Sequence, residues 1–199
     1  MSYSRTLNTY FALWAVCVIA SVLTPLFLIP FNVIGYVVGC VLVVIASVIF
    51  QYLLLYQGWK SIPSDIARTT PGKAIGFLFI PIFNFYWMFI AYNGLGKDMN
   101  KTMQQRGIQF HVNENLGLCY CVCVLIFSVT SCVPDICRLI SQILPEKNLD
   151  VLFSIGFIAL IPMAVAGLIS IFALIGFLRT IKNGAIALTE SNISQEPQV

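Results

Sequence analysis

The chain alternates long apolar runs with short polar segments. Four runs are long enough to cross a bilayer, because about 20 apolar residues in a helix span its hydrocarbon core. They cover residues 9–29, 33–56, 116–133 and 151–178. The first two runs, and likewise the last two, are joined by a turn or a short loop. The pattern therefore predicts an all-α integral membrane protein with four transmembrane helices in two hairpins.

A fifth apolar segment, about residues 71–92, differs from these four. It carries Pro81 and Asn84 in its middle, and it is rich in Phe, Tyr and Trp. Proline removes a helical hydrogen bond, and a freed carbonyl is costly in lipid unless protein or water satisfies it. Trp and Tyr favour the headgroup level of a bilayer. We therefore expect a central broken helix that is re-entrant or lies at the interface.

The placement of Lys and Arg indicates whether this segment crosses the membrane. If all five runs crossed, six basic residues would lie on one side and five on the other. If the fifth segment returns to the side it came from, nine lie with the termini, and only Arg138 and Lys147 lie opposite. Cytoplasmic loops carry an excess of Lys and Arg. The count predicts four spans with both termini cytoplasmic.

Composition agrees with a single polytopic membrane domain over residues 1–185. The chain is 59% hydrophobic and 10% charged, whereas a soluble domain is about 45–50% apolar and about 25% charged. Within residues 94–106, Leu95, Met99 and Met103 recur every four positions, which predicts a cytoplasmic amphipathic helix. Residues 186–199 are mostly polar, and we expect them to be disordered.

The lead-in to the fifth segment has the pattern of a helix start. Thr70 suits the N-cap position and Pro71 the first helical position. The run from Thr70 to Lys73 is too short for a phosphate-binding P-loop. At the break after Pro81, we expect the Asn84 amide to hydrogen-bond to backbone carbonyls that lack helical partners.

The central part of the chain resembles a known family. The motif runs from Ile62-Pro63 through residues 67–74 and 76–89 to residues 94–100. It is similar to a group of small bacterial multi-span membrane proteins that share a domain of unknown function. The resemblance implies a bacterial inner-membrane protein, and it brings no activity, substrate or catalytic residue with it. The candidate residues in the motif are Arg68, Thr70, Pro71, Gly72, Lys73, Gly76, Pro81, Asn84 and Trp87.

Residues that could carry catalysis or bind a metal are few. The chain has one histidine, His111, and no paired carboxylates within a span. A metal site at Cys119, Cys121 and Cys123 would need thiolates that converge with further ligands. Small apolar cysteines are the commoner case in a helix. We therefore expect no enzyme activity, no cofactor and no metal.

Two other cysteines, Cys132 and Cys137, flank Pro134. In the four-span topology they lie at the outer end of the third span, with a loop between them. If that face meets an oxidising compartment, the pair is a candidate disulfide.

Two functional hypotheses remain. The first is a non-enzymatic scaffold or regulator whose cytoplasmic face, residues 57–115, meets anionic lipid headgroups or a protein partner. That face carries six basic residues and three acidic ones: Lys60, Arg68, Lys73, Lys97, Lys101 and Arg106 against Asp65, Asp98 and Glu114. The alternative for these charges is that they only fix the topology. The net charge of +3 is too small to indicate nucleic acid.

The second hypothesis is a channel or small-solute transporter lined partly by residues 76–87. Broken segments are where transporters place their binding sites. Ion-coupled carriers usually hold ionisable groups within the membrane, and none of the four predicted spans contains one. Four spans are few to enclose a pathway, so such a channel would be a homo-oligomer.

Overall fold

The computed structural model describes residues 3–28, 33–143 and 149–195, and these residues form helices and connecting loops with no strand. The elements are α1 (Tyr3–Leu28), α2 (Val33–Lys60), α3 (Pro71–Gly76), the 3₁₀-helix η1 (Phe77–Phe79), α4 (Phe83–Met88), the π-helix η2 (Phe89–Gly94), α5 (Leu95–Gln105), α6 (Glu114–Ile143) and α7 (Leu149–Gln195).

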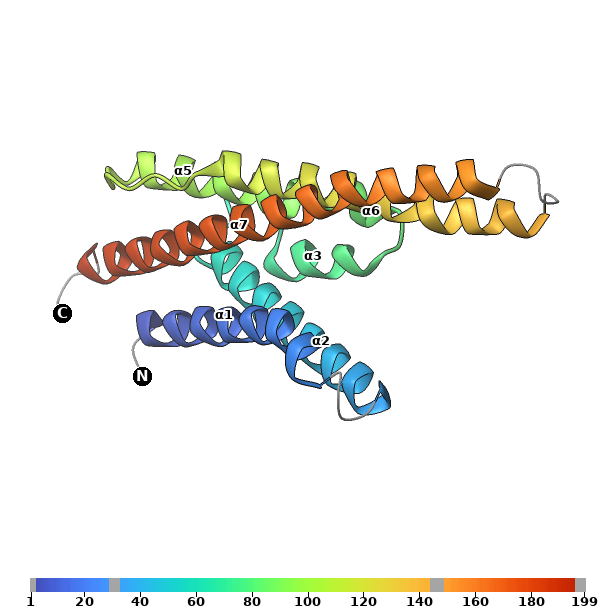
Figure 1. Cartoon of the computed structure of the whole chain (residues 1–199). Coiled ribbons are helices and arrows are strands. Elements are labelled where there is room, and N and C mark those ends of the chain that lie inside the picture. The colour runs from blue at the N-terminus through green and yellow to red at the C-terminus, as the bar shows by residue number, and fades with distance from the viewer. Residues whose placement is uncertain (1–2, 29–32, 144–148, 196–199) are drawn as a thin grey trace.

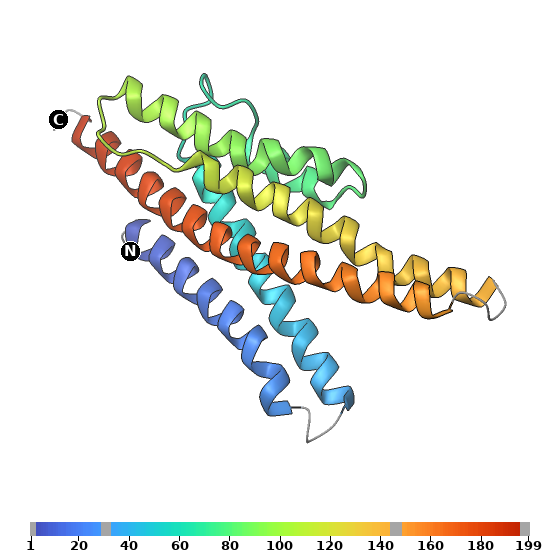
Figure 2. The same cartoon turned by 45° about the horizontal axis from the view of Figure 1, so that its top comes forward.

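Two long hairpins make the frame of the molecule. Helix α1 packs on α2, and α6 packs along α7. In both views the start of α1, the end of α7 and the end of α5 lie at one end of the molecule (Figures 1 and 2). The end of α1 and the end of α6 lie away from it. From α3 the chain runs toward a turn that lies midway along α6, and it returns to the shared end through α4, η2 and α5.

Among the residues whose side chains the structure describes, three helices are long and apolar enough to cross a membrane: Val37–Lys60, Glu114–Ile140 and Ser154–Asn192. They agree with the predicted spans at 33–56, 116–133 and 151–178. The predicted span at 9–29 falls on α1, which is not among the three. Its residues from 21 onward lie outside the part of the chain whose side chains are described.

Buried side chains gather at the shared end of the two hairpins, which we call the packed half. Its largest fully buried members include Trp14, Trp59, Leu95, Phe177 and Ile181. Beyond the packed half the hairpins continue as the arms, residues 37–50, 122–140 and 154–172. Most of the large apolar side chains of the arms are exposed. The core therefore holds the two hairpins together only at one end.

Helix α6 continues through Pro134 to Ile143, whereas the sequence pattern ends the third span at Val133, directly before the proline. A proline removes one donor and crowds the preceding turn. Here the packing of α6 along α7 continues past that point, and neighbouring helices allow a proline inside a membrane helix. The predicted loop at 135–150, with a short interfacial helix over 136–144 as the alternative, is therefore a continuation of α6 as far as Ile143, and residues 144–148 lie outside the described residues.

Helix α7 continues to Gln195, so the predicted disorder from residue 186 is wrong as far as Gln195. Residues 196–199 lie outside the described residues. Ala185 and Leu188 are fully buried, and the Arg106 guanidinium donates to the Leu188 carbonyl at 3.4 Å and to the Asn192 side chain. These contacts with α5 are tertiary, and a polar composition alone does not reveal them.

Candidate functional site

The segment from α3 to η2, residues 71–94, folds back on itself, and we call it the fold-back segment. Its first helix begins as the sequence predicts. Thr70 is the N-cap in extended conformation, Pro71 follows at the first turn, and the Thr70 hydroxyl accepts from the Lys73 backbone N–H at 3.4 Å. A serine or threonine cap satisfies a backbone donor that has no partner within the helix. The predicted cap is therefore confirmed.

The chain reverses between η1 and α4. Ile80 is extended, and Ile82 has a φ of 66°, which is unusual for a β-branched residue. The Phe83 N–H donates to the Pro81 carbonyl at 2.7 Å, and the Asn84 N–H donates to the Ile80 carbonyl at 2.9 Å. The reversal is therefore a hydrogen-bonded turn, with the unusual backbone at Ile82.

The structure does not show the predicted bond from the Asn84 side chain to the backbone. Within the described residues, Asn84 bonds at this turn through its backbone N–H alone, and its side chain is partly exposed. Because the Asn84 N–H and the Phe83 N–H already bond at the turn, the amide is not required to bridge the break.

Aromatic rings hold the two limbs of the fold-back segment together. Phe77 on the first limb meets Trp87 edge-on, with ring centroids 4.7 Å apart, and Phe83 stacks on Trp87 at 5.5 Å. The Trp87 indole N–H donates to the Ala74 carbonyl at 3.0 Å. Such ring pairs contribute roughly 0.5–1.5 kcal/mol beyond burial of their area. Trp87 thus fixes the limbs by both packing and a hydrogen bond.

An ion pair fixes the base of the fold-back segment to α5. The Arg68 side chain donates to both Asp98 oxygens, from Nη2 at 2.6 Å and from Nε at 3.0 and 3.1 Å, and its backbone N–H also donates to Asp98. The Asp98 side chain is only 7% exposed. Its hydrogen bonds raise the pKa of the Arg68 guanidinium. A Cβ at Gly94 would come within 3.2 Å of Arg68 Cδ, so the glycine leaves room for this arginine.

Two further contacts join η2 to the hairpins. The Trp59 indole N–H donates to the Ala91 carbonyl at 3.1 Å. The Gln51 amide donates to the Tyr92 hydroxyl at 2.6 Å and to the Tyr120 hydroxyl at 3.3 Å, which links α2, η2 and α6. Buried polar groups of this kind are costly unless they are paired. The π-helix therefore sits in a fixed position between the two hairpins.

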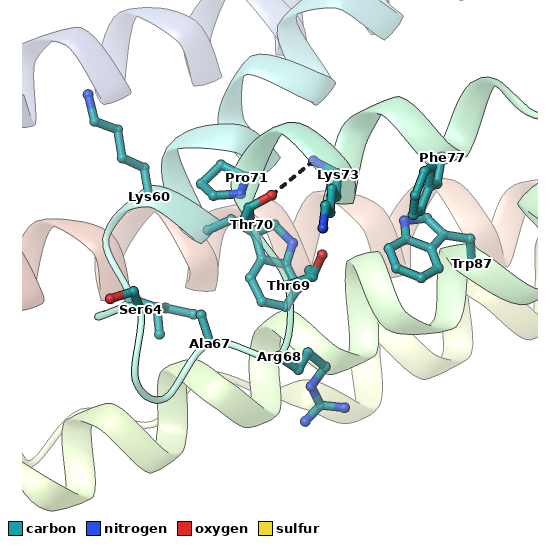
Figure 3. Close-up of a pocket in the computed structure, with 12 residues that line it drawn as sticks. Lys60, Ser64, Ala67, Arg68, Thr69, Thr70, Pro71, Lys73, Phe77 and Trp87 are labelled. Atoms are coloured by element: carbon teal, nitrogen blue, oxygen red, sulfur yellow. Dashed lines mark hydrogen bonds between the residues drawn. The ribbon is translucent and has the colours of Figure 1, made fainter.

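A cavity of about 560 Å³ opens between the end of α2, the loop that follows it and the base of the fold-back segment (Figure 3). Five of the predicted candidates, Arg68, Thr70, Pro71, Lys73 and Trp87, line it. The motif residues that the sequence singles out are thus largely neighbours in space.

The other candidates lie elsewhere. Gly72 and Gly76 are exposed, and a Cβ at either position would meet nothing within 4 Å. Pro81 and Asn84 lie at the turn of the fold-back segment, away from the cavity lining. Sequence reasoning missed the roles of Trp59 and Asp98. A signal for Asp98 was present, because it directly precedes Met99 on the predicted apolar face of α5.

The predicted Cys132–Cys137 disulfide is wrong. Both are free cysteines, and both lie on the continuous helix α6. Five residues of helix rise about 7.5 Å and turn the two side chains to different faces, which is beyond the span of a disulfide. In the described part of the chain, no group of three or more His, Cys, Asp and Glu side chains is arranged to hold a metal.

Comparison with known proteins adds no relative. No protein-family model, no curated protein and no solved structure matches the chain. The resemblance to small bacterial multi-span proteins therefore stays a prediction.

Proposed function

We propose that the chain is a non-enzymatic multi-pass protein of the bacterial inner membrane, with four spans and both termini cytoplasmic. In this proposal the fold-back segment is re-entrant from the cytoplasmic side. The basic face over residues 57–115 meets anionic lipid, and the protein acts as a scaffold or regulator at that surface. A cytoplasmic protein partner is the other candidate for this face.

The observation that best supports this proposal is that the fold-back segment has an exposed apolar turn and a base held by an ion pair. Its turn exposes large apolar and aromatic side chains: Ile82 is 84% exposed, Phe79 67% and Tyr86 63%. Its base is held by the Arg68–Asp98 ion pair. Exposed apolar patches of this kind mark contact with lipid or with another protein. Because the turn projects along the apolar arms (Figure 2), lipid is the contact that fits all of these surfaces.

The arrangement of the ends supports the same topology. The start of α1, the end of α5 and the end of α7 lie together (Figures 1 and 2). Helix α7 has 47 residues and is about 70 Å long at 1.5 Å per residue, more than twice the thickness of a hydrocarbon core. Part of it must therefore extend beyond the bilayer, and Arg106, directly after α5, donates to the Leu188 carbonyl in the C-terminal part of α7.

An oligomeric channel or small-solute transporter is the second candidate. The observation that favours it is the π-helix η2 beside the buried Gln51–Tyr92–Tyr120 contacts, since π-helical turns recur at functional sites. Against it, the amide and hydroxyls of this group bond to one another, and these bonds would have to break for a solute to use them.

Reconstitution of the purified protein separates the two candidates. In liposomes with anionic lipid, we expect ion and small-solute flux equal to that of empty liposomes. We also expect a higher melting temperature than in zwitterionic lipid, with a difference that shrinks as salt is added. Flux above the empty control would replace the scaffold with a channel. Equal stability in both lipids would mean that anionic lipid is not the partner of the basic face.

A further inference from the structure

The cavity beside the fold-back segment has an unequal distribution of charge. Lys60, Arg68 and Lys73 line it, and among the described residues no acidic side chain does. Figure 3 shows Lys60 pointing away from the cavity and Arg68 pointing away from it toward α5, the helix of Asp98. Lys73 on α3 extends on the side where Thr69 lies. The charge available to a bound group is therefore that of Lys73.

Thr69 supplies a second, independent feature. The residue is 9% exposed, and its hydroxyl makes no hydrogen bond to the described residues. No buried side-chain oxygen or nitrogen in that part of the chain lacks a partner, so the Thr69 hydroxyl reaches solvent, on a residue that lines the cavity. It offers a donor to whatever occupies that space, next to the Thr70 hydroxyl that caps α3.

The apolar wall of the cavity indicates what kind of molecule this is. Phe77 and Trp87 line the cavity, and they also belong to the aromatic cluster that leads to the exposed turn at Ile82. An ammonium and hydroxyl donors suit a phosphate oxygen. Inorganic phosphate has no apolar part that could contact an aromatic wall, whereas a phospholipid can contact both the polar and the aromatic side of the cavity. The volume of about 560 Å³ lies in the range of ligand sites.

We propose that this cavity binds the phosphate headgroup of an anionic lipid, with Lys73 and the Thr69 hydroxyl as its contacts. The acyl chains would follow Phe77 toward the turn of the fold-back segment. The inference rests on the proposed membrane placement and deepens it, because it assigns lipid recognition to one cavity and not to the whole basic face.

The test uses the full chain, purified in a mild detergent, and measures binding of phosphatidylglycerol by native mass spectrometry. We expect Lys73→Gln to weaken binding about fivefold, in line with one basic side chain near anionic lipid. Thr69→Val should weaken it about threefold, the lower range for one hydrogen bond. Lys73→Arg should bind within about twofold of the parent chain, because it keeps the charge.

Lys101→Gln is the matched control, because Lys101 is exposed on the same face and does not line this cavity. This variant should bind lipid like the parent chain.

Two outcomes overturn the proposal. Equal weakening by Lys73→Gln and Lys101→Gln would mean that the whole basic face, and not the cavity, attracts lipid; the proposed function would then survive. Displacement of the lipid by millimolar inorganic phosphate or glycerol phosphate would make the ligand a soluble phosphate. Melting temperatures of all variants, measured alongside, show that each is folded.

Discussion

Two neighbouring apolar stretches of α7, residues 165–172 and 173–178, have opposite surroundings. Phe172 is 71% exposed, and Phe177, five residues later, is fully buried. The same contrast holds on α2, where Ile45 is 50% exposed and Leu54 is 1% exposed. Hydrophobicity alone therefore tells which residues avoid water, and it does not tell which residues meet protein and which meet lipid.

What separates the packed half from the arms is the presence of specific partners. The packed half contains the Arg68–Asp98 ion pair, the Gln51–Tyr92 bond and the Trp59–Ala91 bond. The arms contact one another through α6 and α7, and their outward faces carry Val, Ile, Leu and Phe. In the proposed placement, the specific contacts of the packed half determine the fold, and the outward faces of the arms contact lipid.

The largest expected effect comes from removing a buried aromatic ring from the packed half. Phe177→Ala should lower the free energy of unfolding by about 3–5 kcal/mol, because it leaves a cavity in a closed core. Phe172→Ala is the control on the same helix and should change it by less than about 1 kcal/mol, since its ring faces outward. Thermal unfolding in detergent measures both. Equal losses would show that the arms are packed as tightly as the core.

The next effect concerns the base of the fold-back segment. Arg68→Ala leaves the Asp98 carboxylate unpaired at 7% exposure, and breaking a buried pair costs about 3–5 kcal/mol. Because the Arg68 side chain is 43% exposed, solvent screens part of this interaction, and we expect the free energy of unfolding to fall by about 2–3 kcal/mol. Lys97→Ala, on the exposed face of α5, should stay within about 0.5 kcal/mol. A loss below about 1 kcal/mol for Arg68→Ala, within the range of a surface pair, would contradict the anchoring role.

A smaller effect is expected at close helix contacts. A Cβ at Gly117 would come within 2.9 Å of the Phe177 ring, so Gly117→Ala should cost about 1–3 kcal/mol through overpacking. At Gly167, in the arms, the nearest atom would be Phe127 at 3.5 Å, an ordinary contact. Gly167→Ala should therefore be neutral or slightly stabilising, given the higher helix propensity of alanine. The reverse order in melting temperature would contradict the contrast between the halves.

The smallest effect is at the turn of the fold-back segment. Ile82 has a φ of 66°, a conformation that glycine adopts at little cost. Ile82→Gly should raise the free energy of unfolding in detergent by about 1 kcal/mol, the lower end of the strain expected there. Ile82→Val is the control, since it keeps the β-branched strain and should leave stability unchanged. A lower stability for Ile82→Gly would show that the side chain packs at the turn.

Features set by neighbours in sequence were predictable, as the α3 cap and the face of α5 show. Thr70 and Pro71 start α3 where the pattern places them, and Leu95, Met99 and Met103 are all buried. Each of these depends on local spacing and backbone preference, which a single sequence carries.

Features set by distant partners were not predictable. Asp98 pairs with a residue 30 positions away, and Gln51 bonds to Tyr92 on another element. The reversal lies at Ile82, between Pro81 and Asn84 where the sequence predicts a break, and local backbone hydrogen bonds hold it. Pro134 remains inside α6 because a neighbouring helix supports it. For the ion pair, the Gln51 bond and Pro134, the deciding interaction is tertiary, and no local pattern encodes it.

The central claim is that the fold-back segment enters lipid and returns to the side it came from. Single cysteines at Gly72, Ile82 and Gln104, in a chain without its native cysteines, test it by labelling with an impermeant maleimide in inverted and right-side-out vesicles. The account predicts that Gly72→Cys and Gln104→Cys react from the cytoplasmic face only, and that Ile82→Cys reacts from neither face. Reaction of positions 72 and 104 from opposite faces would mean that the segment crosses the membrane, and it would contradict the four-span account.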